Sequence, residues 1–203
     1  RENRGSEIVK ELQEKMYPIN TDPEFFFNAA EWKINSHKKE YEESYIFAYF
    51  LGNTPSYRNV VTEVARKLNC KIVALRHLDQ YIESDENFGD YAPYDVDPTR
   101  FLNLLRGAKY ICTDSFHGSV FSIIHHKQFI IFNRYDETSK HSKNSRIDTL
   151  CQNLSLTNRR FTSNENLFEQ LTESIDYKKV DEKLNQLRKF TEEYLNKALK
   201  DIK

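Results

Sequence analysis

Four short runs of apolar residues stand out along the chain, each bounded by polar or turn-forming residues. They are rich in aromatic and β-branched side chains. Runs of this kind are typical of strands that are buried on both faces of a parallel sheet. The four predicted strands are Tyr45–Leu51, Lys71–Leu75, Tyr110–Thr113 and Gln128–Phe132.

Segments with a helical spacing of apolar residues separate and follow these strands. Val60, Val64 and Leu68 mark a helix after the first strand. Asp97-Pro98 predicts the start of a second helix and Gly107 its end. Further helices are predicted at 119–125, 146–154, 163–175 and 179–200. The alternation predicts an α/β fold, a Rossmann-like parallel sheet with helices on both faces.

The pattern of apolar and charged residues changes twice along the chain and divides it into three parts. Residues 1–44 are poor in apolar side chains, with Asp22-Pro23 as a break and a charged, helical stretch from Glu31 to Glu43. We interpret them as a junction to an N-terminal domain that this sequence lacks. Residues 45–162 form the Rossmann-like domain, and residues 163–203 are predicted to be C-terminal helices that pack on it.

Composition excludes several functional classes. Apolar residues make up 38% of the 203 residues, which is typical of a globular protein. A net charge of -1 gives no attraction to nucleic acid or to an anionic membrane. No apolar run approaches the ~20 residues of a membrane span. Cys70, Cys112 and Cys151 lie far apart without metal-site spacing, so we interpret them as reduced thiols of a cytoplasmic protein.

Polar residues follow three of the predicted strands, where ligands bind in open α/β sheets. These segments are Gly52-Asn53, Asp114–Gly118 and Asn133–Arg146. In the second, a strand runs directly into a turn and a helix. With Ser115 as the N-cap, His117 lies in the first helical turn, where free N–H groups and the helix dipole attract an anion. His117 there can transfer a proton, but a capping turn with a packed histidine explains the residues equally well.

The third segment carries a possible anion-binding arginine. Ser145 and Asp148 fit a capping box, which places Arg146 at the first helical position. Its guanidinium can hold a carboxylate or phosphate through two parallel hydrogen bonds, although a solvated basic loop is the commoner meaning of such a run. Gly52-Asn53 fits a plain turn better than a phosphate-binding loop. We place Arg159-Arg160 on the surface.

The run Ala108–Phe121, centred on Ser115-Phe116-His117-Gly118, resembles the hallmark of the polysaccharide pyruvyl transferase family. Tyr45–Asn53, Asn144–Ile147, and Asp22-Pro23 followed by Trp32 fall in the expected order, so the resemblance covers roughly residues 1–162. It implies one half of a two-domain fold like that of B-type glycosyltransferases, with the active site between the halves. The implied reaction transfers a pyruvyl group from phosphoenolpyruvate to two hydroxyls of a bacterial exopolysaccharide, or of its lipid-linked precursor, and forms a ketal.

The resemblance also implies roles for individual residues. His117 would be catalytic, as the proton-transfer group. Many members carry Arg-Leu-His where this chain has Ser115-Phe116-His117, so the arginine that binds phosphoenolpyruvate must come from elsewhere, and Arg146 is the candidate. No metal and no cofactor is expected besides the donor substrate. The implied substrate-binding residues are Gly52, Asn53, Ser115, Phe116, Gly118, Ser119, Lys143, Asn144 and Arg146.

The expected partners are phosphoenolpyruvate, a glycan or lipid-linked sugar acceptor, and the absent N-terminal domain. The expected location is the cytoplasm, with the inner face of the membrane as an option. Two alternatives stay open: a glycosyltransferase-like enzyme that uses a nucleotide sugar, and a non-catalytic half-domain that binds a glycan or a partner protein. The acidic loop 79–97 is interpreted as solvated, with contact to an acceptor sugar as its alternative.

Overall fold

The computed structural model describes residues 3–13, 19–32, 40–77, 80–135 and 144–200. Four parallel strands form one sheet in the order β2-β1-β3-β4. Each predicted strand is found, and the first and last end slightly earlier than predicted. The strands are β1 (Tyr45–Tyr49), β2 (Lys71–Leu75), β3 (Tyr110–Thr113) and β4 (Gln128–Ile131).

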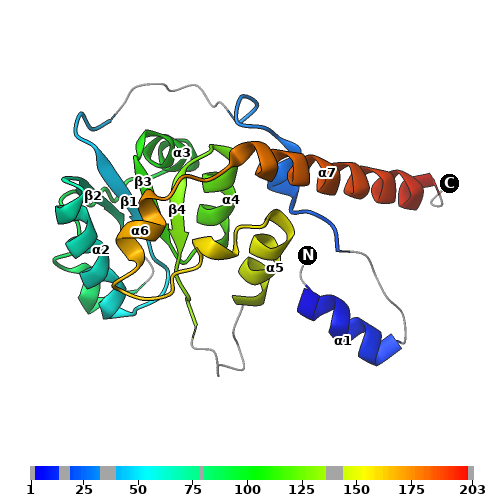
Figure 1. Cartoon of the computed structure of the whole chain (residues 1–203), viewed down its shortest axis with the longest axis horizontal. Coiled ribbons are helices and arrows are strands. Elements are labelled where there is room, and N and C mark those ends of the chain that lie inside the picture. The colour runs from blue at the N-terminus through cyan, green and yellow to red at the C-terminus, as the bar shows by residue number, and fades with distance from the viewer. Residues whose placement is uncertain (1–2, 14–18, 33–39, 78–79, 136–143, 201–203) are drawn as a thin grey trace.

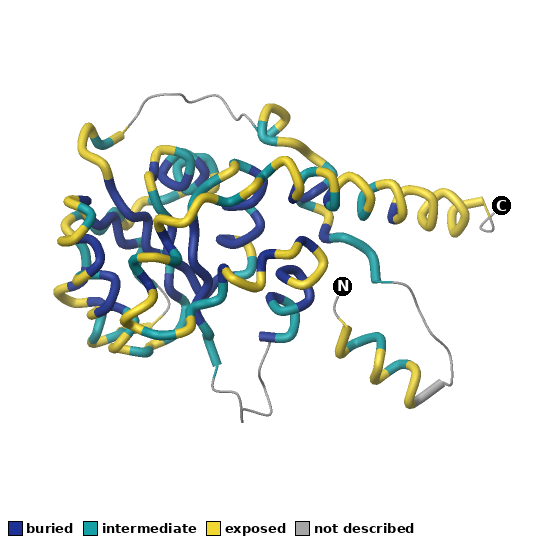
Figure 2. Tube along the Cα trace, viewed as in Figure 1, coloured by how far each residue is buried: buried dark blue, intermediate teal, exposed yellow. Residues whose placement is uncertain are grey.

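Helices cover both faces of the sheet (Figure 1). One face is covered by α2 (Pro55–Lys67) and α6 (Leu167–Thr172). The other is covered by α3 (Pro98–Gly107), α4 (Phe116–Ile124) and α5 (Asn144–Leu154). Two helices flank this body, α1 (Asn3–Gln13) and α7 (Tyr177–Lys200), and the outer part of α7 is exposed (Figure 2). Three short 3-10 helices are η1 (Pro23–Phe26), η2 (Glu83–Asp85) and η3 (Thr157–Arg159).

The continuous apolar runs are explained by burial on both sides of the sheet. Successive side chains of a strand point to opposite faces. Tyr45 and Phe47 accordingly join the core under α3 and α4, while Ile46 and Ala48 join the core under α2. All four side chains are almost fully buried. The α/β, Rossmann-like fold with helices on both faces is therefore confirmed.

Two predictions about local structure are wrong. Helix α5 is already formed at Asn144, so Ser145 is inside the helix and does not cap it. Residues 40–43 are not helical, although the prediction extended a helix from Glu31 to Glu43; residues 33–39 lie outside the described residues. The charged pattern misled there because charges on a helix surface and in a solvated connector look alike in sequence.

The surface prediction for Arg159 is also wrong, because its side chain is completely buried in η3. The guanidinium donates to the backbone carbonyls of Gln170 (2.6 Å) and Glu173 (3.1 Å), and it pairs with the Glu173 carboxylate. These carbonyls belong to the end of α6 and the residue after it, where helices leave backbone acceptors without internal partners. Arg159 therefore fastens α6 to η3.

Cys70, Cys112 and Cys151 are buried free thiols. Among the described helices, none is both long and apolar enough to pass through a membrane.

Candidate active site

The carboxyl ends of the strands lie side by side, as the sequence predicted. Tyr49 at the end of β1 pairs with Leu75 of β2 and with Thr113 of β3, and Thr113 pairs with Ile131 of β4. The segments that follow β1, β3 and β4 therefore leave the sheet at a single edge.

A buried carboxylate joins the first two of these segments. Asp114, directly after β3, accepts hydrogen bonds from the backbone N–H groups of Leu51 (2.7 Å) and Gly52 (2.8 Å) after β1. Burial raises the pKa of Asp114 above its ordinary value, although the two N–H donors and the charges of Arg134 and Arg58 oppose the shift. A Cβ atom on Gly52 would lie 3.0 Å from the Asp114 carboxylate, which explains a glycine at this position.

The turn after Asp114 is built as a capped helix start. Ser115 has an extended backbone, and its side-chain oxygen accepts from the Gly118 N–H at 3.3 Å. Thr113 supports the turn from the strand, since its hydroxyl accepts from the Ser115 N–H (3.0 Å) and donates to the Tyr49 carbonyl (2.6 Å). The predicted N-cap is therefore confirmed, and His117 is the second residue of α4.

Three of the predicted substrate-binding residues face the protein interior. Ser115, Gly118 and Ser119 are buried, and the Ser119 hydroxyl donates to the Ser115 carbonyl at 2.9 Å. Gly118 would have to leave room for a substrate beside its backbone. Instead, a Cβ atom there would lie 2.7 Å from the Thr113 hydroxyl, so the space is already occupied by protein. These residues shape the turn that presents Phe116 and His117.

His117 projects outward from this turn, with 56% of its side chain exposed. Its Nε2 lies 3.4 Å from a carboxylate oxygen of Glu24 in η1. The position of Glu24 is well fixed, because the neighbouring Phe25 is buried in the core and the Trp32 indole donates to the Glu24 carbonyl at 3.0 Å. Sequence reasoning missed Glu24, since nothing in the local pattern places residue 24 beside residue 117.

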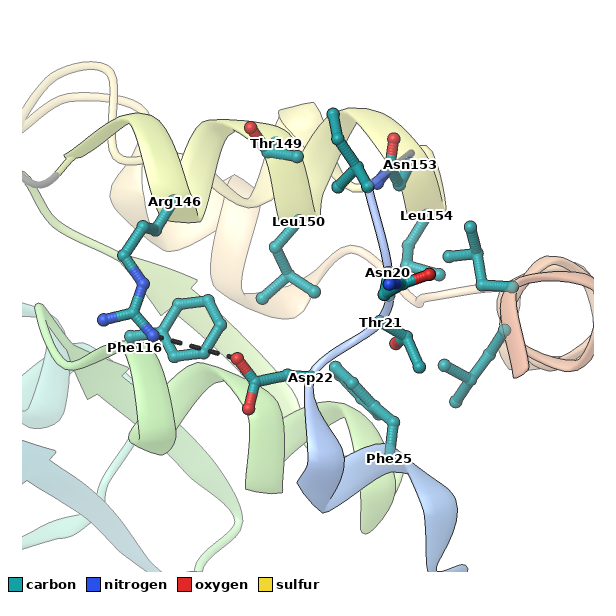
Figure 3. Close-up of a pocket in the computed structure, with 13 residues that line it drawn as sticks. Asn20, Thr21, Asp22, Phe25, Phe116, Arg146, Thr149, Leu150, Asn153 and Leu154 are labelled. Carbon is teal, nitrogen blue, oxygen red and sulfur yellow. Dashed lines mark ion pairs between the residues drawn. The ribbon is translucent and has the colours of Figure 1, made fainter. Parts of the chain in front are cut away.

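Arg146 reaches the same turn from the first turn of α5. Its guanidinium carbon lies 4.2 Å from the centre of the Phe116 ring, a cation–π geometry. One guanidinium nitrogen is 3.8 Å from the carboxylate of Asp22, as Figure 3 shows. The adjoining pocket, with a volume of about 30 Å³, has room only for water. A substrate would therefore contact the outer edge of Arg146.

The remaining predicted substrate-binding residues are Asn144, Asn53 and Lys143. The Asn144 side-chain amide is mostly buried and donates to the Tyr135 carbonyl at 2.8 Å, which ties the start of α5 to the segment after β4. Asn53 is exposed at the rim beyond β1. Lys143 lies outside the described residues.

The arrangement can support proton transfer next to an anion. His117 supplies a titratable group, while Arg146 and the first N–H groups of α4 supply positive charge and donors. The carboxylate of Glu24 in η1 faces His117, and that of Asp22, the residue before η1, faces Arg146. The described residues contain no group of three His, Cys, Asp or Glu side chains arranged to hold a metal ion.

Comparisons with known proteins bear on both family and fold. The sequence model of the polysaccharide pyruvyl transferase family matches residues 2–136. No curated protein matches the chain significantly. A glycotransferase of kitacinnamycin has a similar structure, with 14% identity and a TM-score of 0.50 over 77% of this chain and 42% of its own. A putative UDP-N-acetylglucosamine 2-epimerase from Listeria monocytogenes shares 15% identity with a TM-score of 0.45, over 74% and 43%. The chain thus spans less than half the length of either protein.

Proposed function

Because this chain belongs to the polysaccharide pyruvyl transferase family, we propose that it takes part in moving a pyruvyl group from phosphoenolpyruvate to two hydroxyls of a glycan, with formation of a cyclic ketal. The match over residues 2–136 confirms the family that the Ser115–Gly118 turn predicted. The observation that carries the proposal is that His117 and Arg146 both lie against the Phe116 ring, at the ligand-binding edge of the sheet. The donor, the acceptor and the ketal are all part of the proposal.

The first step is protonation of the donor. The His117 imidazolium gives its proton to the methylene carbon of phosphoenolpyruvate, which becomes a methyl group. The adjacent C2 then carries positive charge shared with the oxygen that bridges to phosphorus. His117 is exposed and thus accessible to a substrate, and the Glu24 carboxylate lies 3.4 Å from its Nε2.

The remaining steps build the ketal and release phosphate. One glycan hydroxyl forms a bond to C2 and returns a proton to His117. The second hydroxyl then attacks C2 as the bond between C2 and the phosphate oxygen breaks. One proton of the diol ends on the new methyl group and the other leaves with the phosphate. The products are therefore one ketal and one hydrogen phosphate.

Holding the donor requires groups that bind two anions, its carboxylate and its phosphate. Arg146 has five N–H donors in a planar fork, and its pairing with Asp22 at 3.8 Å is loose. The N–H groups on its outer edge can therefore donate hydrogen bonds to a carboxylate or phosphate while Asp22 stays in place. The N–H groups at the start of α4 are the natural second contact. Gly52, Asn144 and Lys143 are proposed to line the rest of the donor site, and Asn53 the acceptor side.

The direct test follows the donor carbon atoms. The native full-length protein is incubated with ¹³C-labelled phosphoenolpyruvate and glycan acceptors, and the products are examined by NMR. We expect a labelled methyl group and a labelled ketal carbon on the glycan, with one phosphate released per ketal. Sugar transfer from a nucleotide sugar without consumption of phosphoenolpyruvate would favour the glycosyltransferase alternative. Glycan binding without any transfer would favour the non-catalytic alternative.

A further inference from the structure

A second hollow opens at the same edge of the sheet, beyond β1 and β2 and apart from the His117 turn. Its volume is about 550 Å³, within the range of roughly 300–1,000 Å³ that is usual for small-ligand sites. Asn53 after β1 forms one wall, Asn59 of α2 another, and the stretch Tyr81–Ser84 leading into η2 a third. We call these residues the Tyr81 pocket.

A buried ion pair fixes the walls of the Tyr81 pocket relative to one another. Arg58 of α2 donates to the Asp85 carboxylate of η2 at 2.8 Å, and both residues are buried. The same guanidinium donates to the Thr54 carbonyl at the start of α2 and lies over the Phe50 ring. A buried pair of this kind tolerates little displacement, because a separated charge would be left without a partner. The pocket is therefore preorganised.

The walls offer polar groups that the protein itself leaves unused. The side-chain amides of Asn53 and Asn59 are exposed to the hollow, and each can both donate and accept.

The Tyr81 ring forms an aromatic side of the pocket, and carboxylates lie close to it. Its side chain is 74% exposed although it lines the hollow. Desolvation, followed by the nearby carboxylates of Glu86 and Glu83, raises the pKa of the Tyr81 phenol. These carboxylates repel anions, and no lysine or arginine is among the described residues that line the hollow. A phosphate or a carboxylated sugar is therefore a poor fit.

We propose that the Tyr81 pocket binds a neutral sugar residue of the glycan acceptor. Sugar hydroxyls both donate and accept hydrogen bonds, so they can pair with the amides of Asn53 and Asn59 and with the Glu83 carboxylate, which only accepts. The apolar C–H face of a pyranose ring can cover the exposed Tyr81 ring. Asn53 follows Gly52, which is bonded to Asp114, so a glycan held here runs along the same edge toward His117. The assignment as an acceptor site rests on the proposed function.

Binding is measured first, by saturation-transfer NMR on the full-length protein. The neutral probes are lactose, cellobiose, mannobiose and chitobiose, and the anionic probe is glucuronate, all at millimolar concentration because single-site sugar binding is weak. We expect a signal from at least one neutral probe and none from glucuronate. Tyr81→Ala should reduce that signal at least about fivefold. Tyr94→Ala is the matched control, since Tyr94 is 79% exposed and lies outside the pocket.

The outcomes separate this inference from the proposed function. Absence of signal from every neutral probe overturns the pocket, and so does an equal signal from Tyr81→Ala and Tyr94→Ala. In the transfer assay, Tyr81→Ala should raise the acceptor KM and leave kcat unchanged. Transfer by Tyr81→Ala with an unchanged acceptor KM refutes the pocket while the reaction stands. Sugar binding that depends on Tyr81, in a wild-type protein that forms no ketal, refutes the reaction while the pocket stands.

Discussion

At the scale of single residues, the site depends on how His117 is held. The ring is attached to a capped helix start, and Glu24 approaches its Nε2 from a segment anchored by Phe25 and Trp32. The partner of one ring nitrogen decides which tautomer the imidazole adopts and how the ring is oriented. Glu24 is therefore a positioning residue in our account, and His117 is the catalytic one.

Glu24→Gln tests this role, because glutamine keeps the size of the side chain and removes its charge. We expect kcat for pyruvyl transfer to fall by roughly tenfold, equivalent to about 1.4 kcal/mol, with little change in the KM for phosphoenolpyruvate. Glu24→Asp should recover part of the loss. Stability should change by no more than about 1 kcal/mol, because the partner of Glu24, His117, is more than half exposed.

The same helix supplies the control for this experiment. At its other end, His126 Nε2 lies 3.0 Å from the Asp181 carboxylate, in an exposed pair far from the proposed site. Asp181→Asn should leave kcat at the wild-type value. Equal effects of Glu24→Gln and Asp181→Asn on kcat would mean that Glu24 has no special relation to the chemistry.

At the scale of elements, α4 joins two different electrostatic environments. Its first turn presents His117 to solvent at the ligand-binding edge. Directly after its last residue, His125 lies next to the basic side chains of Arg106 and Lys127. Desolvation, and then the charges of Arg106, Lys127 and His126, lower the pKa of His125 to about 4. His125 is therefore neutral in the folded protein at pH values where it would be charged in the unfolded chain.

This difference predicts that acid weakens the fold through His125. Between pH 6.5 and about 4 the unfolded state binds a proton that the folded state does not, so stability falls as the pH falls through this window. The loss should be on the order of 2–3 kcal/mol, at about 1.4 kcal/mol per pKa unit. Urea unfolding of wild type and His125→Gln at pH 7 and at about pH 4.5 measures it. His126→Gln is the control and should retain most of the loss, because His126 makes the smallest contribution to the lowered pKa of His125. An identical pH dependence in wild type and His125→Gln would contradict the assignment.

The elements also show what a sequence can predict. The four strands and the Ser115 cap depend on local signals, namely apolar runs and a side chain that bonds an N–H three residues ahead, and these were predictable. Glu24 beside His117, and Arg159 inside the core, depend on contacts between distant segments. A charged residue gives no local sign that it will be buried or paired. The Tyr81 pocket was hidden for the same reason, since the Arg58–Asp85 pair that shapes it joins residues 27 positions apart.

At the scale of the whole molecule, the chain spans 42% of the glycosyltransferase-like structure that it resembles. The division at residues 44 and 162, and the N-terminal domain expected from the sequence, stay predictions. The site described above is open on the side away from the sheet, where His117 and Tyr81 are exposed. A second domain facing this edge would enclose the substrates and exclude water.

The isolated 203-residue chain should therefore fold without catalysing transfer. We expect a cooperative thermal transition by circular dichroism, because the sheet is buried on both faces by its own helices. We expect no ketal from phosphoenolpyruvate under conditions in which the full-length protein forms it. Ketal formation by the isolated chain at the full-length rate would show that no further domain is needed.

The most direct test of the central claim compares two variants of His117 in the full-length protein, with single-turnover rate and melting temperature measured on the same samples. His117→Ala should lower the rate of pyruvyl transfer by about 10²–10⁴-fold, the usual contribution of a positioned acid–base group. His117→Asn should recover little of it, since an amide donates a hydrogen bond but cannot transfer the proton. Both melting temperatures should stay close to wild type, because the side chain is exposed and contributes little packing. Wild-type rates in both variants, or rates that fall only in proportion to lost folded protein, would contradict the claim that His117 is the catalytic proton donor.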